Sequence, residues 1–408
     1  MTTEKTQLRL NLAVAWLGWL FDGLEMGLYS LIAVPAMKEL LKTEQSVSIG
    51  PYVGIMFALF LLGASIGGFV FGHLGDRWGR VKTMVITVLV YAVFTGLSAV
   101  AATAWQFGIC RFLGALGLGG EWGLGVALVM ETWPNSKRPL LAGILGAAAN
   151  VGFLLAALIG LFAGGLGWRA LLLFGLVPAA LAFFIRLKVK EPELWKQVRD
   201  RGEKPDPREL WRPPLRGLTI KGCLAASVVV IGTWGVFQWI PSWVNTLVGG
   251  DAVRERATVQ MFMAFGQIIG SFLGGPAAEW LGRRKSYALF CGGSFIFSVV
   301  LYGVVNSYGA PLLALAAVAG VFSTAFFGWL PLYLPELFPT RIRATGEGLT
   351  YNFGRILAAA GVVLGTGNLV AVFHGSFAKA GAVMASIYIL GMVLIRFMPE
   401  TKGGTLPR

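Results

Sequence analysis

Five ionisable side chains fall inside apolar stretches that are long enough to cross a lipid bilayer. They are Asp22, Glu25, Arg111, Glu121 and Arg355. A charge at the centre of a bilayer costs about 2.5–3.5 kcal/mol on insertion scales, so each of them needs a partner, a water-filled cavity or a function. Carboxyl groups in this setting can exchange protons, and a guanidinium can hold a carboxylate through two parallel hydrogen bonds. These residue types therefore suit the handling of protons and organic anions.

Asp22 and Glu25 lie three residues apart, which places both on one face of a helix. Together with Glu121 they are the candidates for proton coupling. A carboxyl that is partly removed from water near an arginine changes its protonation when that arginine moves away. The alternative for Glu25 and Glu121 is that each only packs one helix against another.

Arg355 is the first candidate for binding an anion. It lies twelve residues after Arg343, or roughly 18 Å into its span, and no acid occurs within four residues of it. Its planar guanidinium matches a carboxylate, and Tyr351 and Asn352 share its helical face. The alternative is that Arg355 pairs with an acid from another span, such as Glu25.

Aromatic and amide side chains within the spans suggest the rest of a pocket, since pockets combine apolar walls with a few polar anchors. Trp122 follows Arg111 by eleven residues and so lies on nearly the same helical face. The further candidates for substrate binding are Trp122, Asn150, Gln238, Trp239, Trp329 and Tyr333. Because Trp and Tyr also gather at membrane interfaces, an interfacial or packing role is the alternative for each ring.

The composition requires most of the chain to face lipid. Hydrophobic residues make up 56% of the 408 residues, charged residues make up 13%, and the mean hydropathy is +0.71. Windows of about 20 apolar residues predict twelve membrane-spanning helices, six in each half of an all-α protein. They lie near residues 10–35, 52–72, 83–103, 106–131, 140–164, 169–187, 220–247, 258–281, 286–306, 311–334, 345–370 and 377–398.

A charged, proline-rich stretch separates the two sets of six spans. Proline breaks long helices, so this stretch is expected to be a linker on the membrane surface. The predicted domains are an N-terminal half at 1–187, a cytoplasmic linker at 188–218 and a C-terminal half at 219–408.

The basic residues predict the orientation and account for the net charge of +14. If both termini are cytoplasmic, 26 of the 34 Lys and Arg residues lie on the cytoplasmic side, as the positive-inside rule requires. The exceptions are Lys38, Lys42, Arg169, Arg254, Arg256 and Lys379 outside, and Arg111 and Arg355 within spans. Because the basic residues bracket spans and form no single stripe with aromatics, nucleic acid is not an expected partner.

Patterns typical of an enzyme, a metal site or a nucleotide-driven pump are missing from the sequence. Cys110, Cys223 and Cys291 lie in or beside apolar segments without the spacing of metal ligands, so they are expected to pack. No Gly-x-x-x-x-Gly-Lys-Ser/Thr run occurs. Only two histidines, His73 and His374, are present, and no nucleophile with a base and an orienting group is visible. We therefore expect no catalytic residue, no metal and no cofactor.

A charged motif occurs twice, about 200 residues apart, in corresponding places of the two halves. The copies are GHLGDRWGRVK at 72–82 and GGPAAEWLGRRK at 274–285. Together with RFLGALG at 111–117 and PELFPTRIRATG at 335–346, they resemble the major facilitator superfamily over nearly the whole chain. The resemblance implies two six-helix bundles around a central cavity, which opens to either side of the membrane in turn.

Shorter segments resemble particular groups within that superfamily. GWLFDG at 18–23, GGE at 119–121 and GWRA at 167–170 are similar to proton-coupled importers of small organic acids, namely the sialate and lactate symporters and the nicotinate and aromatic-acid transporters. PETKG at 399–403 is similar to sugar porters, so a proton-coupled or facilitative sugar or polyol porter is the alternative. Span five, at 143–152, lacks the Gly-Pro pair that resembles an antiporter signature, which favours uptake.

The resemblance also has implications for the site and its partners. Spans one, four, seven and ten would line the cavity, and Asp22 and Arg111 would pair across spans one and four, which makes Arg111 a substrate-binding candidate. The alternative is that this pair is only structural. The implied partners are a small organic anion, protons and the lipid bilayer, and the protein would act as a monomer in a bacterial-type inner membrane. A non-transporting membrane sensor on the same fold would normally carry a longer cytoplasmic tail or loop.

The charged motifs and the ends of spans four and ten predict a cytoplasmic gate. In such a gate an acid pairs with a basic residue or a helix end of a neighbouring span while the cavity is closed to the cytoplasm. The glycines of the first motif permit close helix approach. For the charges alone, a plain positive-inside role is the alternative. The expected gate residues are Gly72, Gly75, Asp76, Arg77, Gly79, Arg80, Glu131, Arg138, Arg283, Arg284, Glu336, Arg341 and Arg343.

Overall fold

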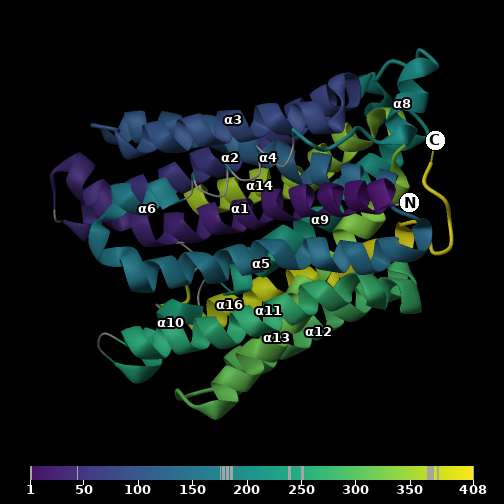
Figure 1. Ribbon diagram of the computed structural model, residues 1–408. Coiled ribbons are helices and arrows are strands. Elements are labelled where there is room, and N and C mark those ends of the chain that lie inside the picture. The colour runs from purple at the N-terminus through teal and green to yellow at the C-terminus, as the bar shows by residue number, and fades with distance from the viewer. Residues whose placement is uncertain are drawn as a thin grey trace.

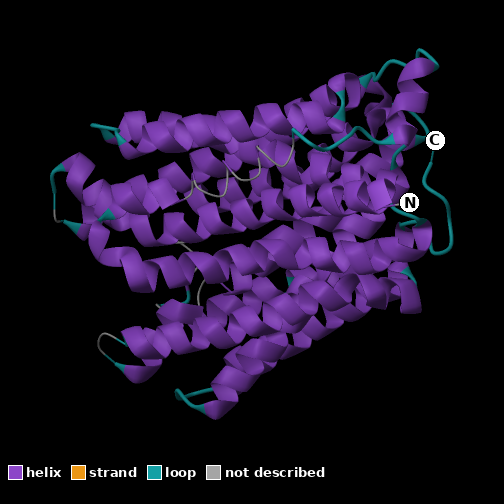
Figure 2. Ribbon diagram, viewed as in Figure 1, coloured by secondary structure: helices purple, strands orange, loops and turns teal. Residues whose placement is uncertain are grey.

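The protein is built from helices that run side by side, and both chain termini lie at the same end of the bundle (Figure 1). We call this end the terminal side. No strand occurs in the described part of the chain (Figure 2). The computed structural model describes residues 2–43, 45–174, 176, 180, 183, 187–237, 240–249, 252–364, 372–374 and 376–407. Among these residues, ten helices are long and apolar enough to cross a membrane.

The helices follow one another in two halves joined by a linker. The first half contains α1 (Thr2–Leu41), α2 (Ser46–Trp78), α3 (Arg80–Ala99), α4 (Ala104–Thr132), η1 (Asn135–Lys137), α5 (Arg138–Ala163), η2 (Gly164–Leu166) and α6 (Trp168–Phe174). The linker contains α8 (Glu193–Asp200) and η3 (Pro207–Trp211). The second half contains α9 (Leu215–Phe237), α10 (Ile240–Val248), α11 (Val253–Leu281), α12 (Arg283–Val304), α13 (Ala310–Tyr333), η4 (Leu334–Leu337), η5 (Thr340–Ile342), α14 (Arg343–Leu364), α16 (Phe377–Ala385), α17 (Ile387–Leu394) and η6 (Ile395–Phe397).

The expected all-α membrane fold is confirmed, with differences in the details of some spans. The stretch predicted as one span at 220–247 is described as α9 and α10, and the two residues between them, 238 and 239, lie outside the described residues. The stretch at 377–398 is divided at Ser386 into α16 and α17. Helix α14 covers the predicted span at 345–370 as far as Leu364, and residues 365–370 lie outside the described residues. Most of the predicted sixth span beyond α6 lies outside the described residues.

Each charged motif is a joint between two helices, and no separate loop lies between the spans predicted on either side of it. Helix α2 continues to Trp78, the single residue Gly79 has a φ of 111°, and Arg80 begins α3. In the second copy Gly282 has a φ of 92° and Arg283 begins α12. These positive φ values carry no steric penalty for glycine because it lacks a Cβ, and one residue therefore suffices to reverse the chain.

The two halves contact each other mainly through two helix pairs, α2 with α14 and α5 with α11. Small residues permit this approach. A Cβ atom at Gly72 would collide with the main chain of Ala344, and one at Gly143 would collide with the carbonyl group of Phe272. Small residues at helix contacts are typical of membrane proteins, where close packing replaces the hydrophobic driving force. Both contacts lie toward the terminal side, which is where the halves are held together.

Large apolar side chains cover the outside of the bundle. Phe162 is 83% exposed, Trp280 is 79% exposed and Phe397 is 65% exposed. Soluble proteins rarely present large contiguous apolar patches to water, whereas such side chains are suited to lipid. The surface therefore agrees with a protein that crosses the membrane many times.

The linker is packed against the terminal side of the bundle (Figure 1). Pro192 precedes α8, which buries Trp195 and Val198 on one face. Asp206 begins η3 by accepting a hydrogen bond from the main-chain nitrogen of Arg208 at 3.0 Å. The proline residues thus limit the helices to short segments, as predicted, and these segments lie where they can touch the ends of the spans.

The packing of α4 on α2 gives the first prediction. A Cβ atom at Gly119 would collide with the carbonyl group of Ala64, so Gly119→Val must push two helices of the same half apart. Overpacking of this kind costs about 1–3 kcal/mol, and the melting temperature of the purified protein is expected to fall by several degrees. The control is Gly361→Val, because a Cβ atom there meets no neighbour within 4 Å. Equal melting temperatures for the two variants would contradict this account of the packing.

Candidate functional site

One buried ion pair joins the two halves near the middle of α1 and α14. Arg355 Nη2 donates to Asp22 Oδ2 at 2.6 Å, and both side chains are only 5% exposed. Arg355 Nη1 also donates to Asn352 Oδ1 at 3.3 Å, and the guanidinium carbon lies 5.2 Å from the centroid of the Tyr351 ring. Asp22 Oδ1 accepts no hydrogen bond within the described residues. The pair therefore holds α1 against α14 and leaves one carboxylate oxygen unused.

A second buried pair lies entirely within the first half. Arg111 of α4 donates to Glu25 of α1. The guanidinium carbon of Arg111 lies 5.0 Å from the ring centroid of Tyr29 and 4.9 Å from that of Phe60, at distances that permit cation–π attraction. Arg111 Nε and Nη2 donate to no acceptor within the described residues.

The expected pairing of Asp22 with Arg111 is wrong. Asp22 pairs with Arg355, and Arg111 pairs with Glu25. Three residues turn a helix by about 300°, so the two acids point about 60° apart and reach different neighbours. The alternative that Arg355 binds an acid from another span is the one observed, with Asp22 in the place suggested for Glu25.

Aromatic rings lie beside the pair that joins the halves. The ring of Trp122 in α4 stacks on Tyr351 in α14, with centroids 4.0 Å apart and an angle of 16° between the rings. Trp19 of α1 meets Trp122 edge to face at 6.0 Å. Trp122 Nε1 donates to no acceptor within the described residues. Two further candidates, Gln238 and Trp239, lie outside the described residues.

The predicted amides and Glu121 bond to neighbouring helices. Asn150 Nδ2 of α5 donates to Ser271 Oγ of α11 at 2.8 Å and so bridges the halves. Asn352 Nδ2 donates to the carbonyl of Gly119 in α4 at 3.4 Å and to that of Gly348 in its own helix at 2.9 Å. Glu121 Oε1 accepts from the hydroxyl group of a threonine in α3, Thr87, at 3.3 Å.

Trp329 and Tyr333 lie away from the central pair, so the expectation that they line a central pocket is wrong. Trp329 Nε1 donates to the carbonyl of Arg283 at 2.9 Å, and Tyr333 Oη donates to the carbonyl of Pro399 at 2.8 Å. Their rings stack with centroids 4.4 Å apart. Both residues tie α13 to the terminal side of the second half.

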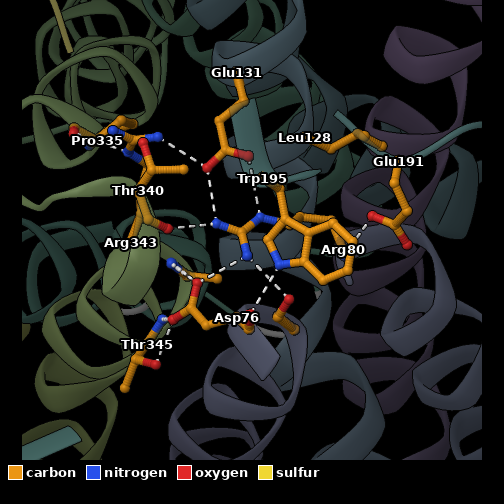
Figure 3. Close-up of polar contacts among 12 residues, drawn as sticks. Asp76, Arg80, Leu128, Glu131, Glu191, Trp195, Pro335, Thr340, Arg343 and Thr345 are labelled. Carbon is orange, nitrogen blue, oxygen red and sulfur yellow. Dashed lines mark hydrogen bonds and ion pairs between the residues drawn. The ribbon is translucent and has the colours of Figure 1, made fainter. Parts of the chain in front are cut away.

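Four fully buried charges form a second site, which we call the terminal-side cluster: Asp76, Arg80, Glu131 and Arg343 (Figure 3). Arg80 donates to both oxygens of Glu131, from Nε at 3.1 Å and from Nη2 at 2.8 Å, and its Nη1 lies 3.0 Å from Asp76 Oδ1. Arg343 Nη1 donates to Glu131 Oε1 at 2.8 Å. Because Arg343 belongs to the second half, Glu131 is shared between the halves.

Asp76 also caps a helix of the opposite half. Its carboxylate accepts from the main-chain nitrogens of Ala344 at 3.1 Å and Thr345 at 2.8 Å, and from Thr345 Oγ1 at 2.5 Å (Figure 3). These nitrogens belong to the first turn of α14, where the main-chain N–H groups have no acceptor within the helix. This end of the helix also carries a partial positive charge, which favours a carboxylate. The end of α2 therefore binds the start of α14 through a charged side chain.

The linker supports the same cluster from outside. Trp195 Nε1 of α8 donates to the main-chain carbonyl of Asp76 at 2.8 Å. Glu191 accepts from the main-chain nitrogens of Arg80 at 2.7 Å and Lys82 at 3.0 Å, and so caps α3. Burial raises the pKa of Glu191 above its ordinary value, although these hydrogen bonds favour its charged form. The linker thus holds the joint at Gly79 in place.

The second copy of the motif forms a related set of contacts within its own half. Arg283 donates to Glu336 at 2.7 Å and to Glu279 at 2.7 Å, and Glu400 caps α12 by accepting from the main-chain nitrogen of Arg283 at 2.8 Å. Glu279 occupies the position that corresponds to Asp76. Its side chain is 48% exposed and caps no helix of the first half. Within the described residues, the first copy of the motif makes charged contacts to the opposite half and the second copy does not.

The remaining predicted gate residues lie around this cluster. Arg341 donates to Glu209 of the linker at 2.8 Å, which raises the pKa of Arg341. Arg284 Nη2 donates to the carbonyl of Arg396 at 2.7 Å. Arg77 is exposed, Arg138 is half-buried, and Gly72 and Gly75 allow α2 to approach Ala344 and Leu124.

Three residues of this region were not predicted from the sequence as site residues: Glu191, Trp195 and Glu347. The first two lie in the linker, whose proline-rich composition suggested only a connection. Glu347 is fully buried in α14, four residues after Arg343. That spacing places it on the face of Arg343, a signal that the sequence contains.

Comparison with known proteins places this geometry in a family. A family model described as the Major Facilitator Superfamily matches residues 15–362. The chain belongs to the Major Facilitator Superfamily. It is 30% identical over 411 residues to the cis,cis-muconate transport protein of Acinetobacter baylyi, covering 95% of this chain and 94% of that protein. It is 27% identical over 397 residues to the sialic acid transporter of Escherichia coli, covering 95% and 94%.

The fold of this superfamily member matches that of solved transporters. The structure of the proton:xylose symporter bound to 6-bromo-6-deoxy-D-glucose aligns with a TM-score of 0.82 at 18% identity, over 99% of this chain and 98% of that one. At this identity the match concerns the fold alone. Membership of the superfamily and the transport proteins among its relatives, not this fold match, make the protein a multi-pass membrane transporter and not an enzyme. Among the described residues, no group of three or more His, Cys, Asp or Glu side chains could hold a metal ion.

The cap on α14 gives the second prediction. Asp76→Asn replaces one acceptor oxygen by an NH₂ group that faces N–H donors, and charge-assisted hydrogen bonds are worth about 1.5–3 kcal/mol. The ratio of open to closed molecules at the terminal side should rise by about tenfold or more. The measurement is the distance between spin labels at the exposed positions Ser136 and Lys285, in a cysteine-free background. Turnover should slow while substrate affinity is kept.

Glu279→Gln is the matched control, because Glu279 holds the same place in the second motif but caps no helix of the first half. Its label distance should match that of the parent protein. An equal effect of both substitutions, or a loss of affinity with normal turnover in Asp76→Asn, would contradict the capping role.

Proposed function

We propose that the protein is a proton-coupled symporter that imports a small organic anion by alternating access. The class of substrate is a monocarboxylate, a sialate or an aromatic or nicotinate-type acid. The observation that carries the proposal is the buried pair of Arg355 and Asp22, which joins the two halves at the level where they must separate. The relatives named for muconate and sialic acid support the class, since both of those compounds carry carboxylates.

The substrate carboxylate competes with Asp22 for the same guanidinium. A planar guanidinium holds a carboxylate by two parallel hydrogen bonds, and Arg355 at present donates one such bond to Asp22 Oδ2 at 2.6 Å. Trp122 and Tyr351 offer a flat apolar wall beside it, and an aromatic acid could stack there. Binding of the anion therefore removes the partner of Asp22.

Proton uptake follows from the loss of that partner. An ionised carboxylate without a counter-charge is strongly disfavoured in an apolar interior, so Asp22 takes up a proton when Arg355 turns to the substrate. One anion and one proton then enter the site together, and the buried charge stays balanced. This exchange couples transport to the proton gradient.

Glu25 and Arg111 have a different place in this scheme. Both residues belong to the first half, so rocking of the halves does not separate them. We assign them the task of holding α1 against α4 in the register that presents Asp22 to α14. Glu121 remains the second candidate for the proton, since it is buried in α4 of the same half.

The terminal-side cluster serves as the cytoplasmic gate in this proposal. Both termini then lie in the cytoplasm, in agreement with the excess of basic residues on that side. Breaking the bonds of Glu131 and Asp76 to α14 opens the path inward. In this proposal the protein works as a monomer in the inner membrane, with an N-terminal half at 1–187, a cytoplasmic linker at 188–218 and a C-terminal half at 219–408.

The third prediction tests the anion site. Arg355→Lys keeps the charge but loses the planar fork, so the apparent affinity for the true acid should fall by about tenfold or more, at about 1.4 kcal/mol per decade. A thermal-shift screen with nicotinate, benzoate, cis,cis-muconate, sialic acid and xylose first identifies the acid. The amide of that acid is the matched control and should bind poorly to both proteins. Saturable transport of an uncharged sugar, unchanged in Arg355→Lys, would favour the sugar or polyol porter.

The fourth prediction tests the coupling. Asp22→Asn cannot exchange a proton, so it should lose accumulation of the labelled acid against a gradient and keep exchange of preloaded acid. In the parent protein a protonophore should collapse uptake, whereas removal of sodium should leave it unchanged. Glu121→Gln is the comparison, and it should accumulate acid normally. Normal accumulation in Asp22→Asn with loss in Glu121→Gln would transfer the proton site to Glu121.

A further inference from the structure

Glu347 is a buried carboxyl group to which the transport scheme gives no role. It lies in the second turn of α14 and its exposed fraction is 0%. Neither Oε1 nor Oε2 accepts a hydrogen bond from any described residue. Buried polar groups are normally hydrogen-bonded, and an orphaned buried carboxylate is among the most costly arrangements in a protein. Its presence next to a site that must open requires an explanation.

Glu347 lies between the two sites along one stripe of α14. Arg343, Glu347, Tyr351 and Arg355 follow at intervals of four residues, which places them above one another on one face, about 6 Å apart along the axis. Arg343 belongs to the terminal-side cluster, Tyr351 stacks on Trp122, and Arg355 holds Asp22. Glu347 is thus the one member of this stripe without a partner among the described residues.

The terminal-side cluster is already balanced, and every guanidinium nitrogen in it has an acceptor. Its two acids and two arginines carry equal and opposite charge. Arg80 uses Nε and Nη2 on Glu131 and Nη1 on Gly75 and Asp76. Arg343 uses Nη1 on Glu131, Nε on the carbonyl of Pro335 at 3.3 Å and Nη2 on that of Pro407 at 2.7 Å.

Four charged groups are close enough to act electrostatically on Glu347: Arg343 on its own helix, Glu131 on α4, Arg80 at the start of α3 and Asp76 on α2. Arg138 acts on Arg343, Glu336 and Glu131, and its Nε donates to no described acceptor, but it is not among the groups that act on Glu347. The remaining charged residues of this end are exposed or engaged. Arg77 and Arg216 are exposed, Lys221 donates to the carbonyl of Phe397, Glu336 accepts from Arg283, and Arg341 donates to Glu209. An ionised Glu347 would therefore be one negative charge too many in a dry, balanced site.

We propose that Glu347 carries a proton while the terminal side is closed and releases it to the cytoplasm when that side opens. The O–H bond of the carboxylic acid breaks, the proton passes to cytoplasmic water, and the electron pair stays on the carboxylate. Opening separates Arg343 from Glu131 at the same time. Arg343 is then the counter-ion for the carboxylate four residues away on the same helix.

This step places a proton-releasing group about 12 Å along α14 from Arg355, on the cytoplasmic side of the pair. It deepens the proposed function by coupling proton release to gate opening. It rests on that proposal only for the orientation of the protein, since neither the identity of the substrate nor the role of Asp22 enters it. Closure would require Glu347 to recover a proton first.

Glu347→Gln tests the inference, because the amide is neutral and has the shape of a protonated carboxyl. The readout is the distance between spin labels at Ser136 and Lys285 in the full-length protein in nanodiscs without substrate, over the range in which buried carboxyls titrate. In the parent protein the closed state binds the extra proton, so it dominates at low pH. The open-to-closed ratio should rise with pH by up to about tenfold per pH unit. The slope is the change in the logarithm of the open-to-closed ratio per pH unit, and it equals the number of protons released on opening. In Glu347→Gln this number should fall by about one, and the protein should stay mostly closed.

Glu279→Gln is the control, and its slope should equal that of the parent. The melting temperature of Glu347→Gln at low pH should also equal that of the parent, because glutamine replaces a neutral acid there. Two results would overturn the inference: an unchanged slope in Glu347→Gln, or a gate that is open at every pH in that variant. The second result would mean that an ionised Glu347 holds the closed state together. Since no substrate is present, failure here is distinct from failure of the symport proposal.

Discussion

A charge that is removed from water must have a partner, and this constraint organises the whole transporter. The described structure satisfies it twice across the boundary between the halves, once at Arg355 with Asp22 and once at Glu131 with Arg343. Breaking either pair without compensation would strand ions in a low-dielectric interior, at a cost of several kcal/mol. The halves can therefore separate only when another ion, a proton or water replaces the lost partner. In the proposed cycle the substrate is one of these replacements, and this makes alternating access selective.

The same constraint explains why two copies of one motif have different fates. Both copies form a helix joint at a glycine, followed by an arginine that binds a glutamate within reach. Only the acid of the first copy, Asp76, meets the start of a helix from the opposite half. The corresponding Glu279 faces outward and keeps a local bond to Arg283. The two copies of the motif thus form similar helix joints. Only the first copy holds the two halves together through its acid, among the described residues.

Much of this arrangement could be predicted from the sequence, because hydrophobic length and embedded charge are properties of single helices. The fold, the embedded acids and arginines, and the residues of the terminal-side cluster were all expected. The pairing of Asp22 with Arg111 was not correct, since a rotation of about 60° on α1 decides which acid meets which arginine. The place of Trp329 and the orphaned state of Glu347 depend on contacts between distant segments. No periodicity within one helix reports such contacts.

The bond between Arg343 and the carbonyl of Pro407 has a practical consequence for work with this protein. The last described residues of the chain are a structural support for the closing arginine, and Leu406 is buried in the core beside them. A purification tag or fluorescent domain fused directly behind them would pull on that support and shift the resting conformation of the sample. The amino-terminal end of α1 is exposed and bonds to no member of the cluster among the described residues. Fusions placed there are expected not to change the ratio of open to closed molecules.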